Sequence, residues 1–239
     1  PAFTTSRSGG DHGWTENVGG GDFLIYYDEA NTFRWTKRSK TAYRWTGPNM
    51  TEVWYSGITD DEKIRFTYTT RSVRTNDYHR RFHAYQYRFL DDVISPRRLV
   101  FHQMAADYYT GPSFTHYYLG DETGLSSSNV SDPGGNVYKG KAIPFDSQWL
   151  AIDDETSSDG RTKARRGIVS RVSTLNGHAL PLYLHTYGRS WGAPRMMFDL
   201  SSDSVSRSYR AGDVVTGELE FILPPKTVND YWGKDSEFA

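Results

Sequence analysis

Alternation of apolar and polar residues with a period of two is the feature that most constrains the fold. Ile64, Phe66 and Tyr68 alternate with polar residues, and residues 182–187 place Leu182 and Leu184 two positions apart. Successive side chains of a strand point to opposite faces, so such a segment buries one face and leaves the other for a different use. Helical periodicity is hard to find in this chain. The pattern therefore predicts strands.

Roughly a dozen such segments are separated by turn-forming Gly, Asn, Asp and Pro. This texture predicts an all-β fold, a two-layer antiparallel β-sandwich or jelly roll with long connecting loops, rather than a βαβ fold. We expect strands at residues 23–27, 33–37, 43–46, 53–55, 64–70, 81–90, 99–105, 114–119, 149–152, 168–174, 180–187, 196–200 and 214–223. The core should include Phe66, Leu182, Leu184, Leu219 and Phe221.

The length supports one domain. With 239 residues and 36% hydrophobic content, the chain can bury a full core, and sandwiches of this size are often single domains. We therefore expect residues 1–239 to form one β-sandwich domain. Residues 1–21 read as a Gly-rich flexible lead-in, and residues 121–144 as an excursion loop rich in Ser, Gly, Asn and Pro.

Charge and composition exclude several classes of partner. The formal net charge of -1 is not the strong positive charge that is typical of a nucleic-acid-binding protein. No apolar run approaches the roughly 20 residues that cross a bilayer. We expect neither nucleic acid nor membrane as a partner. The absence of Cys excludes disulfides and thiolate chemistry. Local Arg pairs, such as Arg80 with Arg81, read as solvated strand edges, with a cationic groove for a polyanion as the alternative.

A candidate site lies on the second face of residues 182–187. Tyr183, His185 and Tyr187 share that face, opposite Leu182 and Leu184. Arg189 follows just past the end of the strand. Such a face can stack on a ligand and form hydrogen bonds with it.

The same residue types, Tyr, His and Arg, recur in residues 81–90, where neither face is plainly apolar. The preferred register places Phe82, Ala84 and Leu90 in the core, because burying Arg88 would require a partner. It leaves His83, Tyr85 and Tyr87 on the groove face. The inverse register would instead present Gln86 and Arg88.

Further groove residues are expected near strand ends. His102 and Gln103 must point to opposite faces of a regular strand, so only one of them can line a groove. The additional substrate-binding candidates are His102, Tyr109, His116 and Trp191.

The chemistry that would use these residues is eliminative cleavage of a uronic-acid polysaccharide. It needs a base for the C5 proton, an acid for the leaving oxygen and a cation or amide on the carboxylate. Tyr187 or His185 would move the proton, while Arg189 or His83 would steady the carboxylate. No metal or cofactor is required, although residues 153–160 leave calcium open as an alternative to a polar turn. Glu218 and Glu220 read as the outward face of an edge strand rather than as a hydrolytic pair.

In general character the chain resembles the β-jelly-roll polysaccharide lyases and the β-sandwich domains of polysaccharide-degrading enzymes. Phe101 to Gln103 and Tyr209 to Gly212 only echo two motifs of the alginate-lyase type, and no Arg-x-Glu-x-Arg strand is present. The resemblance implies the architecture and a glycan ligand, without a residue-by-residue assignment. We therefore expect a secreted or periplasmic polysaccharide lyase, with a non-catalytic carbohydrate-binding or accessory module as the alternative. The oligomeric state stays open.

Overall fold

The chain folds into antiparallel β-structure. The computed structural model describes residues 25–73, 79–105, 116–121, 124–129, 139–143, 148–153, 165–187, 195–200 and 206–223. These residues form strands, turns and short connections without a helix, which confirms the predicted all-β class. Within them, no helix with the length and apolarity of a membrane span is found.

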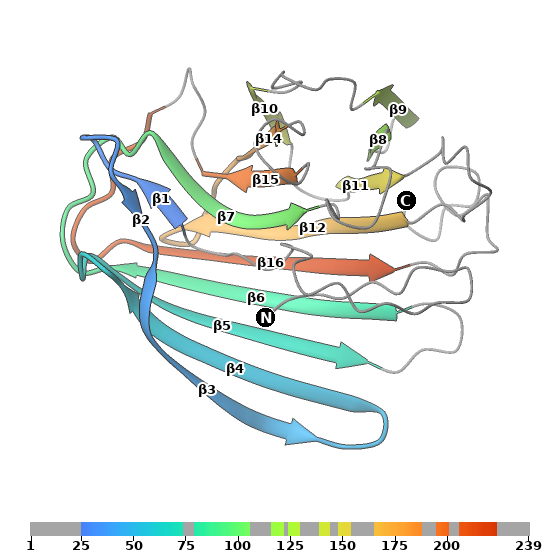
Figure 1. The fold of residues 1–239 in the computed structure, drawn as a ribbon, viewed down its shortest axis with the longest axis horizontal. Helices are drawn as coiled ribbons and strands as arrows, with labels where there is room; N and C mark the ends of the chain where they lie inside the picture. The colour runs from blue at the N-terminus through green and yellow to red at the C-terminus, as the bar shows by residue number, and fades with distance from the viewer. Residues whose placement is uncertain are drawn as a thin grey trace.

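The smaller sheet has six strands, which lie in the upper part of Figure 1. Their order is β10 (Lys139–Ile143), β14 (Leu182–Tyr187), β15 (Arg195–Asp199), β7 (Arg98–Ala105), β1 (Ile25–Tyr27) and β2 (Phe33–Arg34). All of these pairs are antiparallel.

The larger sheet has ten strands and contains the longest elements of the fold. Its β3–β4 hairpin lies at the lower edge of Figure 1, away from the six-stranded sheet. The order is β3 (Thr36–Thr46), β4 (Met50–Thr59), β5 (Ile64–Val73), β6 (His79–Phe89), β16 (Val214–Leu223), β12 (Arg165–Leu175), β11 (Gln148–Asp153), β8 (His116–Asp121) and β9 (Gly124–Asn129), and β13 (His178–Ala179) pairs with β12.

The core lies on one face of β5, β6 and β16. Phe66 pairs with Tyr87 across β5 and β6, and Val215 pairs with Tyr87 across β16 and β6, so these side chains share a face. All three are at most 1% exposed. The six-stranded sheet contributes Leu182, which is fully buried. Gly57 of β4 keeps this packing possible, because a Cβ there would lie 2.7 Å from the Phe66 ring.

Four of the five predicted core residues are confirmed. Phe66, Leu182, Leu219 and Phe221 are each at most 3% exposed, whereas the Leu184 side chain lies outside the described part of the structure. Much of the tyrosine content also belongs to the core. The fully buried aromatic side chains include Tyr26, Tyr68, Tyr87 and Tyr209.

Three expectations about the strands were wrong. The face of β6 with His83, Tyr85, Tyr87 and Phe89 is buried, while Ala84 is exposed and Leu90 is 38% exposed, so the inverse register holds. Strand β16 is central, between β6 and β12, rather than at an edge. Residues 121–144, expected as a loop, contain strands β9 and β10.

The buried glutamate on β16 shows why the edge-strand reading failed. Glu220 is fully buried, and its carboxylate accepts hydrogen bonds from Arg80 and, at 2.6 Å, from Arg171. These cations come from β6 and β12, the two neighbours of β16 in the sheet. A buried carboxylate is tolerated when it is paired in this way.

We predict that Leu182→Ala lowers the free energy of unfolding by roughly 2–5 kcal/mol, because it leaves a cavity between well-packed side chains. The matched control is Leu90→Ala, at a position that is 38% exposed. Its cost should stay below about 1.5 kcal/mol, since little apolar surface is removed from the core. Urea unfolding followed by circular dichroism measures both changes, and equal losses would contradict the placement of the core.

Candidate functional site

The predicted groove residues of β6 are enclosed rather than open. Tyr85 is 3% exposed, and His83 and Tyr87 are at most 1% exposed. The rings of Tyr68 and Tyr85 stack with centroids 4.7 Å apart, and the ring of His83 also stacks on Tyr68, with centroids 5.5 Å apart. Burial of this face therefore does not support the predicted contact of these residues with a substrate.

His83 forms part of a buried polar cluster. Its Nδ1 atom is hydrogen-bonded to the Tyr68 hydroxyl and lies 3.0 Å from Thr70 Oγ1. The Thr70 hydroxyl also donates to the Tyr68 hydroxyl at 2.8 Å. Burial raises the pKa values of Tyr68, Tyr85 and Tyr87 above their ordinary range. These hydroxyls stay neutral and act as hydrogen-bonding groups in the core.

The predicted catalytic residues fall on two different sheets. His185 and Tyr187 lie on β14 of the six-stranded sheet, where they pair with Met197 and Arg195, whereas His83 lies on β6 of the ten-stranded sheet. Tyr183, also on β14, is half-buried. The side chains of His185 and Tyr187 lie outside the described part of the structure, so their predicted roles are not tested.

The remaining candidates are placed only by their strands or not at all. His102 pairs with Phe198 on β15, and His116 pairs with Asp153 on β11. Arg189, Tyr109 and Trp191 lie outside the described residues, as does most of the calcium alternative at residues 153–160. Among the residues that are described, no group of three or more His, Asp or Glu side chains is arranged to hold a metal ion.

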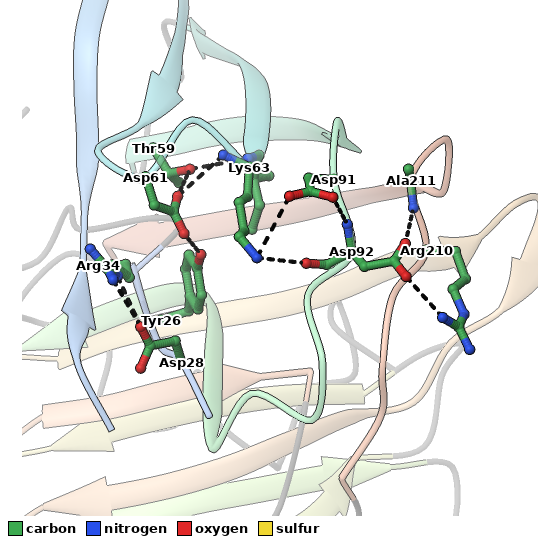
Figure 2. Close-up of polar contacts among 11 residues, drawn as sticks. Tyr26, Asp28, Arg34, Thr59, Asp61, Lys63, Asp91, Asp92, Arg210 and Ala211 are labelled. Atoms are coloured by element: carbon green, nitrogen blue, oxygen red, sulfur yellow. Dashed lines mark hydrogen bonds and ion pairs between the residues drawn. The ribbon is translucent and has the colours of Figure 1, made fainter. Parts of the chain in front are cut away.

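One pocket lies at the end of the sandwich where β1, β2 and the β4–β5 turn meet. Its volume is about 400 Å³, within the range of small-molecule sites, and its lining includes Tyr26, Asp28, Arg34, Asp61 and Lys63. Figure 2 shows Tyr26 beside Asp61 and Arg34 beside Asp28, whereas the Lys63 side chain extends toward Asp91 and Asp92. The Tyr26 hydroxyl donates to Asp61, and the Arg34 guanidinium lies 3.0 Å from the Asp28 carboxylate.

The polar groups that line this end pocket are already hydrogen-bonded to other groups of the protein. Asp61 also accepts hydrogen bonds from Thr59 Oγ1 at 2.6 Å and from the Lys63 backbone N–H at 3.2 Å. Lys63 Nζ donates to the Asp92 carbonyl at 2.9 Å (Figure 2). Burial and the Asp61 hydrogen bond raise the pKa of Tyr26, so its hydroxyl stays a donor. We interpret the pocket as a structural junction that fastens turns from both sheets.

The same junction extends to the turn before β16. The Asp92 carboxylate accepts hydrogen bonds from the Ala211 N–H at 2.9 Å and from Arg210 at 2.8 Å, which Figure 2 shows side by side. The Ala211 hydrogen bond and then Arg210 lower the pKa of Asp92. Burial raises the pKa of Asp28, but the hydrogen bonds from Thr32 and Arg34 lower it by more. The pKa of Asp28 is therefore also lowered. Both carboxylates are therefore ionised at neutral pH.

A second hollow, of about 270 Å³, lies on the outward face of the ten-stranded sheet. It spans β5, β6, β16 and β12, and we call it the outer-face groove. Cross-strand pairing arranges its side chains in two rows. The first row is Thr69, Ala84 and Glu218, and the second is Thr67, Gln86 and Thr216.

The groove differs from the end pocket in the state of its polar groups. Thr67, Thr69, Gln86 and Glu218 make no side-chain hydrogen bond or ion pair with any part of the chain that the structure describes. Gln86 and Glu218 are exposed, and the small Ala84 between them leaves the floor hollow. Hydroxyl, amide and carboxylate groups can together donate to and accept from a polyhydroxylated ligand. This face therefore offers unused hydrogen-bonding capacity on rigid central strands.

An aromatic residue continues the first row on the next strand. Trp54 of β4 pairs with Thr69 and is half-buried, so its indole lies on the outward face beside the groove. Neighbouring strands are about 4.8 Å apart, so the path from β4 to β12 extends about 19 Å. That length accommodates several sugar rings lying across the strands.

Sequence reasoning missed most of this face. In the alternating pattern of residues 64–70, Thr67 and Thr69 were expected simply to face solvent. Gln86 was expected in the core, because the register that exposes it was not the preferred one. The available signal was the run of short polar residues opposite Ile64, Phe66 and Tyr68. The pattern of one strand does not reveal that rows of side chains from three strands align.

The fold is similar to parts of several solved α-galactosidases. The galactosidase domain of an α-galactosidase–sucrose kinase matches with a TM-score of 0.51 and 7% identity, over 85% of this chain and 30% of that one. A GH36 α-galactosidase AgaA variant from Geobacillus stearothermophilus in complex with stachyose matches with a TM-score of 0.50 and 8% identity, over 92% and 31%. An α-galactosidase from Lactobacillus brevis matches with a TM-score of 0.50 and 7% sequence identity, and the match covers 92% of this chain and 30% of that protein.

The chain thus spans about a third of the length of these proteins, and the likeness concerns the fold alone. No protein-family model matches the sequence, and no curated protein matches it. The coarse expectation of a β-sandwich like those of carbohydrate-active proteins is supported, whereas a specific likeness to polysaccharide lyases is not.

We predict that Asp61→Ala lowers the free energy of unfolding by about 1–3 kcal/mol, because it leaves the Tyr26 hydroxyl and its other donors without their acceptor. Chemical unfolding measures this loss. Ligand binding at the outer-face groove should be unchanged in the folded variant. Unchanged stability would contradict the interpretation of the end pocket as a structural junction.

Alkaline pH should unfold the protein through its buried tyrosines. Tyr68, Tyr85 and Tyr87 have folded-state pKa values above those of the unfolded chain, which lie near 10. The contribution of these neutral tyrosines to the free energy of unfolding is fully present below about pH 10 and is lost as the pH rises beyond that value. Phenolate absorbance from these residues should therefore appear together with loss of the circular dichroism signal. Complete phenolate formation in a chain with native circular dichroism would contradict this prediction.

Proposed function

We propose that the protein is a non-catalytic carbohydrate-binding β-sandwich module of a glycan-processing protein, and that it binds a polysaccharide across the outer-face groove. The observation that carries the proposal is the set of unused polar side chains at Thr67, Thr69, Gln86 and Glu218 on one exposed face. Groups that are already hydrogen-bonded must break those bonds to receive a ligand, whereas these four need not. A secreted or periplasmic location belongs to the same proposal.

The similarity to about a third of each α-galactosidase supports a module that works beside a separate catalytic region. One of those proteins was solved with stachyose, which makes an α-galactoside a reasonable first probe. The polysaccharide lyase predicted from the sequence gains no support from the described residues. Its carboxylate-steadying candidate His83 is buried against Tyr68 and Thr70, on a different sheet from His185 and Tyr187.

The experiment is affinity electrophoresis against a panel of neutral and acidic polysaccharides, with calorimetric titration of stachyose alongside. We expect retardation by at least one polymer. Gln86→Ala and Glu218→Ala should each weaken binding roughly two- to tenfold, the cost of one lost hydrogen bond. Ala84→Ile should abolish binding, because a branched side chain suits a strand but fills the hollow floor.

Glu29→Gln is the matched control, since Glu29 is an exposed carboxylate that lines the end pocket instead. Its affinity should equal that of the parent protein. Absence of retardation by every polymer would overturn the proposed function. Equal loss in Glu29→Gln would move the site to the end pocket.

A further inference from the structure

Two arginines stand directly opposite each other beside the outer-face groove. Arg65 of β5 pairs in register with Arg88 of β6, and both side chains are exposed. They lie two residues beyond Thr67 and Gln86 on the same outward face, which is about 7 Å along the strands. Like charges at directly opposed positions of a sheet destabilise it. The pair therefore needs an explanation.

Within the described ranges, no anionic group neutralises this pair. Neither Arg65 nor Arg88 forms an ion pair or side-chain hydrogen bond with the part of the chain that the structure describes. Asp213 precedes Val214, the β16 partner of Arg88, but its carboxylate accepts hydrogen bonds from Asn176 and from the Arg210 N–H.

Other arginines on the same sheet are paired. Arg71 lies 2.6 Å from Glu52, and Arg171 lies 2.6 Å from Glu220. These two arginines are thus neutralised by carboxylates, whereas Arg65 and Arg88 have no such carboxylate among the described residues. Glu218, the free carboxylate of the groove, belongs to the row farthest from them. The arginine pair therefore lies beside one side of the groove, and Glu218 lies in the row farther from it.

We infer that the ligand of the outer-face groove is an acidic glycan, whose carboxylate or sulfate group is held between Arg65 and Arg88. This inference rests on the proposed function. Planar guanidinium groups bind carboxylate and sulfate oxygens through paired N–H donors, and an anion between them converts repulsion into attraction. The neutral hydroxyls of the same sugar then meet Thr67 and Gln86.

The test compares matched polymers that differ only in charge. Polygalacturonate is compared with its methyl-esterified form to probe carboxylate, and dextran sulfate with dextran to probe sulfate. Binding is measured by affinity electrophoresis at low and physiological salt. We expect the acidic member of at least one pair to bind at least about tenfold more tightly, with the difference falling as salt rises.

Variants locate the effect. Arg65→Gln and Arg88→Gln should each remove most of the preference for the acidic polymer while leaving binding of the neutral one intact. Arg97→Gln is the control, because it removes the same charge from an exposed arginine that donates to Asn31 at the β1–β2 turn. Arg88→Glu should abolish the preference and raise the melting temperature, since it turns a repulsive cross-strand pair into an attractive one.

The possible outcomes separate the two proposals. Equal binding of charged and neutral polymers by the parent protein overturns the acidic-glycan inference and leaves the proposed function standing. Binding of neither kind overturns both. A preference that survives in Arg88→Glu, or that is lost equally in Arg97→Gln, also overturns the assignment to this pair.

Discussion

Burial of one face of β5, β6 and β16 is the constraint on which the rest of the structure depends. Phe66, Tyr87 and Val215 are buried on one shared face in the observed register. A slip of one residue in β6 would expose Tyr87 and bury Arg88, which loses roughly 1.5–3 kcal/mol of apolar burial and adds the desolvation of an unpaired cation. The outward positions of Gln86 and Arg88 are therefore a consequence of core packing.

The alternation in β5 could be read from the sequence because its apolar residues are separated by polar ones without exception between Ile64 and Thr70. The same method predicted the all-β class and most of the named core. It failed on β6, where both faces mix aromatic and polar residues. Which face is buried depends on partners in another strand, since Tyr68 and Thr70 of β5 provide hydrogen-bond partners for the Nδ1 atom of His83. A pattern confined to one strand carries no information about such partners.

The same limit explains the glutamate of β16 and the groove itself. Glu220 looks like a solvent-facing residue until Arg80 and Arg171 are brought beside it by the neighbouring strands. The outer-face groove likewise exists only because β5, β6, β16 and β12 are adjacent, although β16 and β6 are far apart in the chain. Strand order in this sheet was not predictable from local composition. The groove residues expected on β6 were therefore assigned to the face that is buried.

Glu220 and the pair of Arg65 with Arg88 show two opposite solutions to charge on one sheet. Glu220 is enclosed by two cations and exchanges its hydration for fixed hydrogen bonds, which stabilises the junction of three strands. Arg65 and Arg88 repel each other at a position where Thr or Gln would serve the sheet better. Sites that bind a ligand commonly retain such local destabilisation, because the charge that weakens the free protein strengthens the complex. The proposed acidic glycan would give this arginine pair such a role.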